Sequence, residues 1–295
     1  MFSTLFKEKP VIDEESKEWI FDTFFWCINQ LDGEFFKHNS ELILPNNTFY
    51  PGSSSSVEEM ADAIFSKTSL YTGMTSWPMK LVSTERFIQK PMPLLSFESR
   101  FRGENAKVHS SIAVQNNAQV GCSIHYKVAG EEVSPTIDIA FHASQLNQPQ
   151  DLIAYLVQIQ AGILVNQQSQ SSSGGMAINA PGGKEVLAQT IDLVACFMGF
   201  GVIFANTAYQ FKGGCGSCNN RNLNRQAALP ELETVYALAL FSVIKGVDIK
   251  TIKKELKSHL YKPFRKAYKE ISVYLQETTN PNHAYLAVNK QTKHS

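Results

Sequence analysis

Two long apolar segments joined by a polar stretch dominate the hydrophobic pattern of the chain. In the first, residues 151–165, apolar positions recur at i, i+3 and i+4 spacing, which predicts an amphipathic helix. The second, residues 186–209, is apolar on nearly every face and predicts a buried helix. The stretch 166–175 between them is rich in Gln and Ser without periodicity, so we expect a surface loop.

The remaining pattern predicts an α+β protein. Helical periodicity occurs at residues 14–31, 57–68, 231–246 and through the basic stretch 245–269. Alternating or β-branched runs predict strands at 42–45, 80–84, 108–114, 121–128 and 136–141. We therefore expect an N-terminal helix and a small, mostly antiparallel sheet within residues 1–148, followed by a helical half over residues 149–295. The two regions are expected to form one continuous globular unit.

Composition narrows the class of protein. Hydrophobic residues make up 43% and charged residues 18% of the chain, and the 27 basic residues equal the 27 acidic ones. This balance is typical of a soluble globular protein without a global field for nucleic acid or membranes. The longest apolar run, residues 193–205, is shorter than the roughly 20 residues of a membrane span. Five cysteines do not make a disulfide framework, and the first ten residues lack the apolar core of a signal peptide, so we expect a cytoplasmic protein without a transmembrane segment.

Four local patterns, in order, carry a resemblance to a known family. They are Leu44-Pro-Asn-Asn-Thr-Phe-Tyr-Pro51, the helix at 152–165, Ile191-Asp-Leu-Val-Ala-Cys-Phe-Met-Gly-Phe-Gly-Val-Ile-Phe-Ala-Asn206, and Glu233-Thr-Val-Tyr-Ala-Leu-Ala-Leu-Phe241. Over roughly residues 41–274 the chain resembles a family of uncharacterised bacterial proteins with a zincin-like, H-E-x-x-H metallopeptidase core. The resemblance implies a zincin-like helical half, with a metal-binding helix at 152–165.

The metal ligands of that family are not retained. An H-E-x-x-H helix presents two imidazoles one turn apart to zinc, with the glutamate as general base. In this chain the two histidine positions fall on Gln158 and Gly162, and the glutamate position falls on Ile159. The family's third, acidic ligand falls on Ala188, while the aspartate of its T-D-L segment is retained as Asp192. The resemblance therefore implies a degenerate site without a metal cofactor, in which Asp192 is a candidate for an outer-shell role.

Other chemistry has weaker support. Cys215 and Cys218 form a C-x-x-C pair in a Gly-rich turn. This spacing is typical of half a zinc site or of a redox pair, but the sequence contains no second C-x-x-C. Candidate bases are His38, His109, His125 and His142, but no motif places a nucleophile beside them. For Gln158 and Asp192 we favour a polar pair that stabilises a helix contact over a remodelled active site.

The basic stretch offers a different kind of site. Its cations are Lys250, Lys253, Lys254, Lys257, Lys262, Arg265, Lys266 and Lys269. Such a face is most often simply solvated, but it can bind nucleic acid or an acidic membrane surface.

The preferred hypothesis is a non-catalytic, zincin-like protein that binds a protein or peptide partner through the former substrate cleft. The alternatives are an active metal-dependent hydrolase with atypical ligands, and a protein that binds nucleic acid or membranes through its basic surface. Metal content separates the first two, and binding that weakens steeply with salt would indicate the third.

Overall fold

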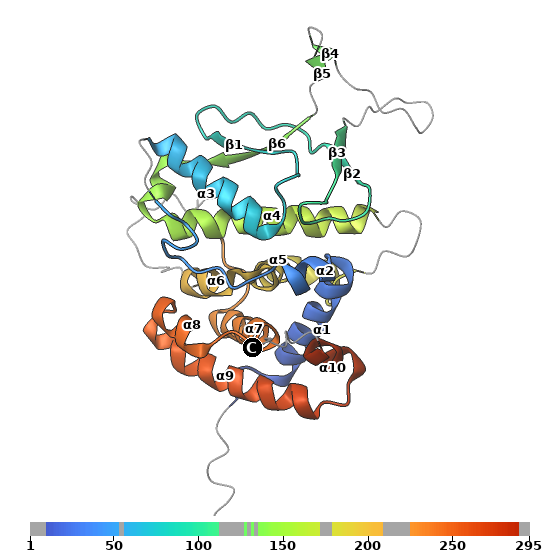
Figure 1. Ribbon diagram of the computed structural model, residues 1–295, viewed down its shortest axis with the longest axis vertical. Helices are drawn as coiled ribbons and strands as arrows, with labels where there is room; N and C mark the ends of the chain where they lie inside the picture. Colours follow the sequence, from blue (N-terminus) through green and yellow to red (C-terminus); the bar gives the residue numbers. More distant parts are fainter. Residues whose placement is uncertain are drawn as a thin grey trace, which may run out of the picture.

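The helix α4 (Pro149–Ser171) lies between two layers of the fold (Figure 1). On one side are α3 (Val57–Thr72) and the paired strands, and on the other are the helices that follow α4 in the chain. The computed structural model describes residues 10–52, 56–111, 127–128, 131–132, 135–171, 179–208 and 225–288. The mixture of helices with short strands confirms the α+β class.

The N-terminal helices begin where the sequence predicts. α1 (Glu14–Gln30) is capped by Asp13, whose carboxylate accepts a hydrogen bond from Ser16 N. In α3 the cap is Ser56, whose hydroxyl accepts a hydrogen bond from Glu59 N. The short helix α2 (Gly33–His38) is an addition to the predicted elements.

The strands form three separate pairs in the described part of the chain, which corrects the single, mostly antiparallel sheet. β1 (Met79–Ser83) and β6 (Ile137–Phe141) are parallel, with Leu81 opposite Ile139. β2 (Leu94–Phe97) with β3 (Val108–Ser111), and β4 (Lys127–Val128) with β5 (Glu131–Glu132), are antiparallel. The prediction was wrong about β1 and β6 because alternation reports a half-buried face and not the direction of the partner strand.

The helix α4 extends beyond its predicted end. The expected loop at 166–175 is helical as far as Ser171, and residues 172–175 lie outside the described residues. Gln167 and Gln168 are almost completely buried, and the Gln168 amide donates a 3.2 Å hydrogen bond to Gln30 Oε1 on α1. Gln is a good helix former, and burial against α1 extends the helix through a stretch whose polarity had indicated solvent.

The second apolar segment is a continuous but irregular helical stretch. It comprises the 3₁₀ helix η2 (Gly183–Val186), α5 (Leu187–Ala195), the π-helical turn η3 (Cys196–Phe200) and α6 (Gly201–Thr207). By length and composition alone, Gly183–Thr207 is apolar enough to cross a membrane. However, 72% of its most apolar window is buried inside the protein, as in the core helix of a soluble protein. It is therefore weak evidence for a membrane span.

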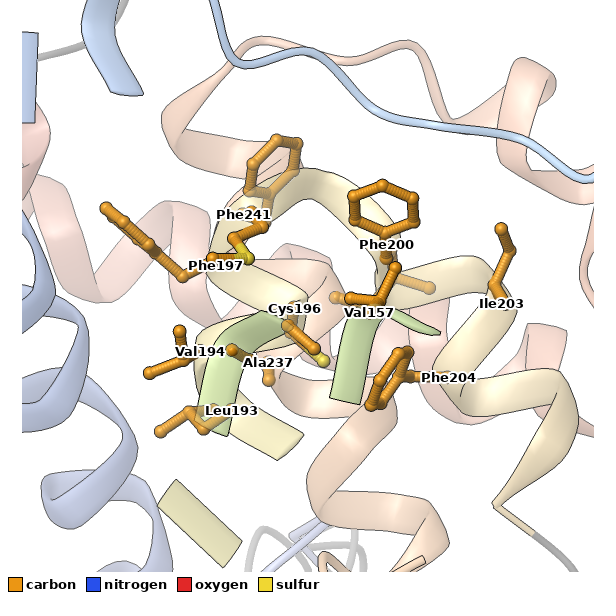
Figure 2. Close-up of a cluster of buried hydrophobic side chains, with 14 of the residues drawn as sticks. Val157, Leu193, Val194, Cys196, Phe197, Phe200, Ile203, Phe204, Ala237 and Phe241 are labelled. Carbon is orange, nitrogen blue, oxygen red and sulfur yellow. The ribbon is translucent and has the colours of Figure 1, made fainter. Parts of the chain in front are cut away.

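The hydrophobic core is built around this stretch (Figure 2). The side chains of η3 and its neighbours are fully buried, and they meet Val157 of α4 and Ala237 of α7 (Glu231–Ile244). Phe197 stacks on Phe36 of α2 with ring centroids 4.4 Å apart. This single core contains buried residues from both predicted regions, 1–148 and 149–295.

The C-terminal helices cover α7. α8 (Ile249–Glu255) and α9 (Ser258–Glu277) follow it, and α9 packs along α7 while α10 (Pro281–Val288) contacts α1 and α9. Gly246 has φ +62° just after α7, a left-handed conformation that commonly ends a helix. Through α10, the C-terminal helices contact the N-terminal helix α1.

Gly199 in η3 is the point where an N-terminal segment docks on the core. A strand was predicted at residues 42–45, but residues 41–44 form an extended, largely buried segment without a strand partner in the described part of the chain. Ile43 N donates a 2.9 Å hydrogen bond to Gly199 O. Gly199 has φ +102°, and a Cβ there would collide with the carbonyl oxygen of Glu41. The apolar run at 42–45 is thus paired with a helix bulge instead of a sheet.

Replacing Gly199 with alanine should therefore destabilise the protein strongly. We expect Gly199→Ala to lower the free energy of unfolding by about 3 kcal/mol, because backbone strain at positive φ adds to a steric clash. Urea unfolding monitored by circular dichroism measures this effect. The control is Gly246→Ala, which also has positive φ but no atom within 4 Å of the added Cβ; it should cost only about 1 kcal/mol. Equal losses would show that segment 41–44 is not held against η3.

Candidate functional site

Asp192 of α5 is the centre of a buried polar cluster that joins α4 and α5 to the segment before α7. Its side chain has no exposed surface. Oδ1 accepts a hydrogen bond of 2.7 Å from Gln158 Nε2 on α4. Oδ2 accepts from Arg225 Nη2 at 3.1 Å, Ala228 N at 2.8 Å and Leu229 N at 3.0 Å. Both carboxylate oxygens are paired, and a buried cation compensates the buried charge.

Arg225 connects Asp192 to the end of α6. Its side chain is 2% exposed. Nη1 donates to Thr207 Oγ1 at 2.9 Å and to Phe204 O at 3.4 Å, and the guanidinium lies 4.1 Å from the centre of the Phe204 ring. A cation is favourable at this position because the last carbonyls of a helix carry partial negative charge. Sequence reasoning missed Arg225, since nothing in its local sequence distinguishes it from a surface arginine.

Gln158 holds the other side of the cluster. Its amide nitrogen donates both to Asp192 Oδ1 and, at 3.0 Å, to the backbone carbonyl of Gln226. An amide nitrogen carries two hydrogens, so these bonds use its full donor capacity. The structure therefore confirms the predicted polar pair of Gln158 and Asp192 across the α4–α5 contact.

The other predicted positions of the degenerate site lie in varied surroundings. Ile159 is half-buried and packs against the hydrophobic core. Gly162 faces α5, where an added Cβ would lie 3.6 Å from Ile191 Cδ1, an ordinary contact distance. Ala188 is exposed in the first turn of α5. The side chains supplied at these positions are apolar.

Metal-binding side chains do not gather in the described part of the chain. Within it, no group of three or more His, Cys, Asp or Glu residues is close enough to hold a metal ion. Cys215 and Cys218 lie outside the described residues. Cys27 and Cys196 are buried free thiols, and burial raises the pKa of both well above the ordinary range, so they remain protonated and unreactive at neutral pH.

The candidate histidines have local partners. His38 and His109 each pair with a nearby glutamate, and His142 caps the 3₁₀ helix η1 (Ala143–Asn147) through Nδ1. His125 lies outside the described residues.

His283, which the sequence analysis did not select as a candidate, is almost completely buried. It lies between Asp22 Oδ1 at 3.0 Å and the Tyr274 hydroxyl at 2.7 Å, and it stacks on Phe21. This chain of contacts joins α10 to α1 and α9.

The predicted basic surface lies on α8 and α9. Its cations are exposed, apart from the half-buried Lys266. Lys253 and Arg265 approach the ring of Tyr261, with their charges 5.5 and 6.0 Å from its centroid. The opposite face of the two helices is buried through Ile252, Leu256 and other apolar residues, so the pair is amphipathic as predicted.

A pocket of about 690 Å³ lies away from the Asp192 cluster. It is bounded by the loop 45–52, α3 and the beginning of α4. The sequence drew attention to this loop as one of the four family-like patterns, but periodicity gave no sign of a cavity beside it.

Comparisons with known proteins supply no assignment. No protein-family model matches the chain, and neither a curated protein nor a solved structure matches it.

Substitutions in the Asp192 cluster should lower the free energy of unfolding by unequal amounts. Asp192→Asn should lower the free energy of unfolding by about 3–5 kcal/mol, because it leaves the Arg225 cation buried without its counter-charge. Gln158→Leu should cost about 1 kcal/mol, because Asp192 keeps its other donors and the Gln226 carbonyl belongs to an exposed residue. Chemical unfolding of both single variants and the double variant measures these costs. An Asp192→Asn variant as stable as the wild type would contradict the buried ion pair of Asp192 and Arg225.

Proposed function

We propose that this chain is a non-catalytic protein with a zincin-like scaffold, and that it acts by binding a protein or peptide partner. The observation that carries the proposal is the state of Gln158. At the position where an H-E-x-x-H helix has its first zinc ligand, the side chain is an amide whose donors are used by Asp192 and the Gln226 carbonyl.

The chemistry of zinc explains why this observation matters. A zinc-binding imidazole needs a free nitrogen lone pair directed at the metal, with its other nitrogen oriented by an outer partner. Gln158 instead directs its donors at a carboxylate and a carbonyl, and the next family position along the helix, Gly162, offers no side-chain atom beyond hydrogen. The geometry therefore favours a structural role for this helix contact over metal-assisted hydrolysis.

The arrangement of the four family-like segments adds support. α4 packs on α5 and α6, and α6 packs on α7. The segment before the Leu44–Pro51 loop docks on Gly199 of η3. All four segments thus belong to one packed unit, as an inherited scaffold requires, although packing alone does not identify the family.

The proposed contact surface is the solvent side of α4 and α5 around the degenerate site. Ala188 and Gln226 are exposed, and Leu187 exposes 42% of its surface at the start of α5. An exposed apolar side chain such as Leu187 is suited to contact with another polypeptide.

Metal content tests the non-catalytic part of the proposal. Protein purified without chelators or a histidine tag should contain less than about a tenth of an equivalent of zinc by mass spectrometry. The variant Gln158→His/Ile159→Glu/Gly162→His/Ala188→Glu restores the family's ligands and should bind about one equivalent. The control is Gly162→His alone, which supplies one ligand and should bind little.

Two outcomes would contradict this prediction. Near-stoichiometric metal in the wild-type protein would show that ligands exist elsewhere, and Cys215→Ser/Cys218→Ser would then test the Gly-rich turn. A restored variant that folds but binds no zinc would show that the assigned positions do not converge.

Selection from a random-peptide display library tests the binding part. We expect peptides that bind the wild-type protein without being cleaved, and whose binding is lost in Ala188→Arg, because a long cation would obstruct the proposed surface. Lys269→Glu on α9 is an exposed control that should leave binding unchanged. Cleavage of the selected peptides, or equal binding by both variants, would refute the proposal.

A further inference from the structure

The pocket beside α3 is lined by three segments that are distant in sequence. The loop 45–52 forms one wall, α3 forms another, and the first turns of α4 close it. Its volume of about 690 Å³ lies within the range of roughly 300–1,000 Å³ that is usual for small-molecule sites. Its lining residues are Pro45, Asn46, Asn47, Tyr50, Pro51, Gly52, Met60, Ala63, Ile64, Ser66, Lys67, Leu70, Thr75, Pro149, Gln150 and Ile153.

The walls of the pocket are largely apolar. Met60, Ile64 and Leu70 contribute from α3, and Ile153 contributes from α4. Leu70 is 47% exposed, so part of this apolar lining is open to solvent. The pocket therefore offers a surface on which a hydrocarbon body would be removed from water.

One cation stands in this apolar wall. Lys67 is half-buried, and the described lining residues include no acidic side chain to neutralise it. On α3 the residues one turn before and after Lys67 are Ala63 and Tyr71, so its own helix does not supply a carboxylate either. The charge of the pocket is thus complementary to an anion.

An amide donor is also without a partner. Gln150 Nε2 is buried, and in the described part of the chain it has no hydrogen-bond partner. Gln150 lies in the first turn of α4, where the helix dipole favours negative charge. By contrast, the Tyr50 hydroxyl is paired with Thr68 and the Asn46 amide donates to Glu255. Lys67 is therefore the one charged group among the described lining residues and Gln150 is its buried donor, while Asn47, Ser66 and Thr75 add exposed neutral side chains.

We propose that this pocket binds an amphiphilic carboxylate, that is, a medium-chain aliphatic acid. Its carboxylate pairs with the Lys67 ammonium, and the Gln150 amide, whose Nε2 has almost no accessible surface in the free protein, turns to donate a hydrogen bond to it. Its hydrocarbon body lies along Met60, Ile64 and Ile153. This assignment does not depend on the fate of the Gln158 position, so it can fail or succeed separately from the proposed function.

The polar groups of the pocket favour an aliphatic acid over the carboxyl end of a peptide. Each buried peptide amide needs a hydrogen-bond partner of its own, which peptide-binding grooves supply from a strand edge or a row of side chains. Among the described lining residues, the uncommitted polar side chains are Lys67, Gln150 and the exposed Asn47, Ser66 and Thr75, and the walls are otherwise mostly apolar. A ligand with one polar head and no further amides satisfies the pocket with the groups that are present.

Isothermal titration calorimetry with three ligands of the same chain length tests the proposal. Decanoate should bind more tightly than decan-1-ol, and decyltrimethylammonium should bind most weakly, because only the carboxylate is complementary to Lys67. Lys67→Met should weaken decanoate binding about tenfold, the loss expected for one charge-assisted hydrogen bond. Lys67→Glu should reverse the order of decanoate and decyltrimethylammonium. The matched control is Lys269→Met, which should leave all three affinities unchanged.

Two further variants separate occupancy of the pocket from general effects of charge. Ala63→Phe adds bulk at an exposed position of the lining and should abolish binding while thermal unfolding is unchanged. Gln150→Met removes the amide and should weaken decanoate binding several-fold with little effect on decan-1-ol. The proposal is overturned if the three ligands bind equally, or if Lys67→Met binds decanoate as the wild type does. It is also overturned if a short peptide ending in free leucine binds and decanoate does not.

Discussion

The buried carboxylate of Asp192 is the interaction on which the arrangement of the helical half depends. It lies in the most apolar segment of the chain, where an uncompensated charge would be costly. Its partners come from α4, from Arg225 and from the backbone just before α7, so satisfying one carboxylate sets the relative positions of these segments. Arg225 extends the constraint to the end of α6 through Thr207.

The irregular turn η3 begins one helical turn after Asp192, and its contacts are apolar where those of Asp192 are polar. Its aromatic residues fill the core beside α7, while the positive φ of Gly199 opens the helix to an extended N-terminal segment. The same apolar stretch thus holds a polar centre at its beginning and a backbone docking point near its middle. The docking point at Gly199 joins the N-terminal region to the helices, and the core contains residues of both.

The helix α4 contributes to both the apolar pocket and the buried Asp192 cluster, through different parts of its length. Its first turn contributes Gln150 to the apolar pocket, and its middle contributes Gln158 to the Asp192 cluster. Among the described residues, the Gln150 amide in the pocket has no hydrogen-bond partner, whereas both donors of the Gln158 amide at the cluster are used. This difference separates a place suited to a ligand from a place suited to holding helices together.

The sequence by itself determined the principal helices and the α+β class, because these follow from the periodicity of apolar and polar residues that are close together in the chain. It also indicated the pairing of Gln158 with Asp192, through the order of family-like segments. Only the tertiary structure decided that Arg225 is the counter-charge, that β1 and β6 run parallel, and that residues 41–44 dock on Gly199. It likewise decided that α4 continues through Gln167 and Gln168. Each of these features depends on a partner far away in the chain, and local hydrophobic pattern does not specify which distant group that partner is.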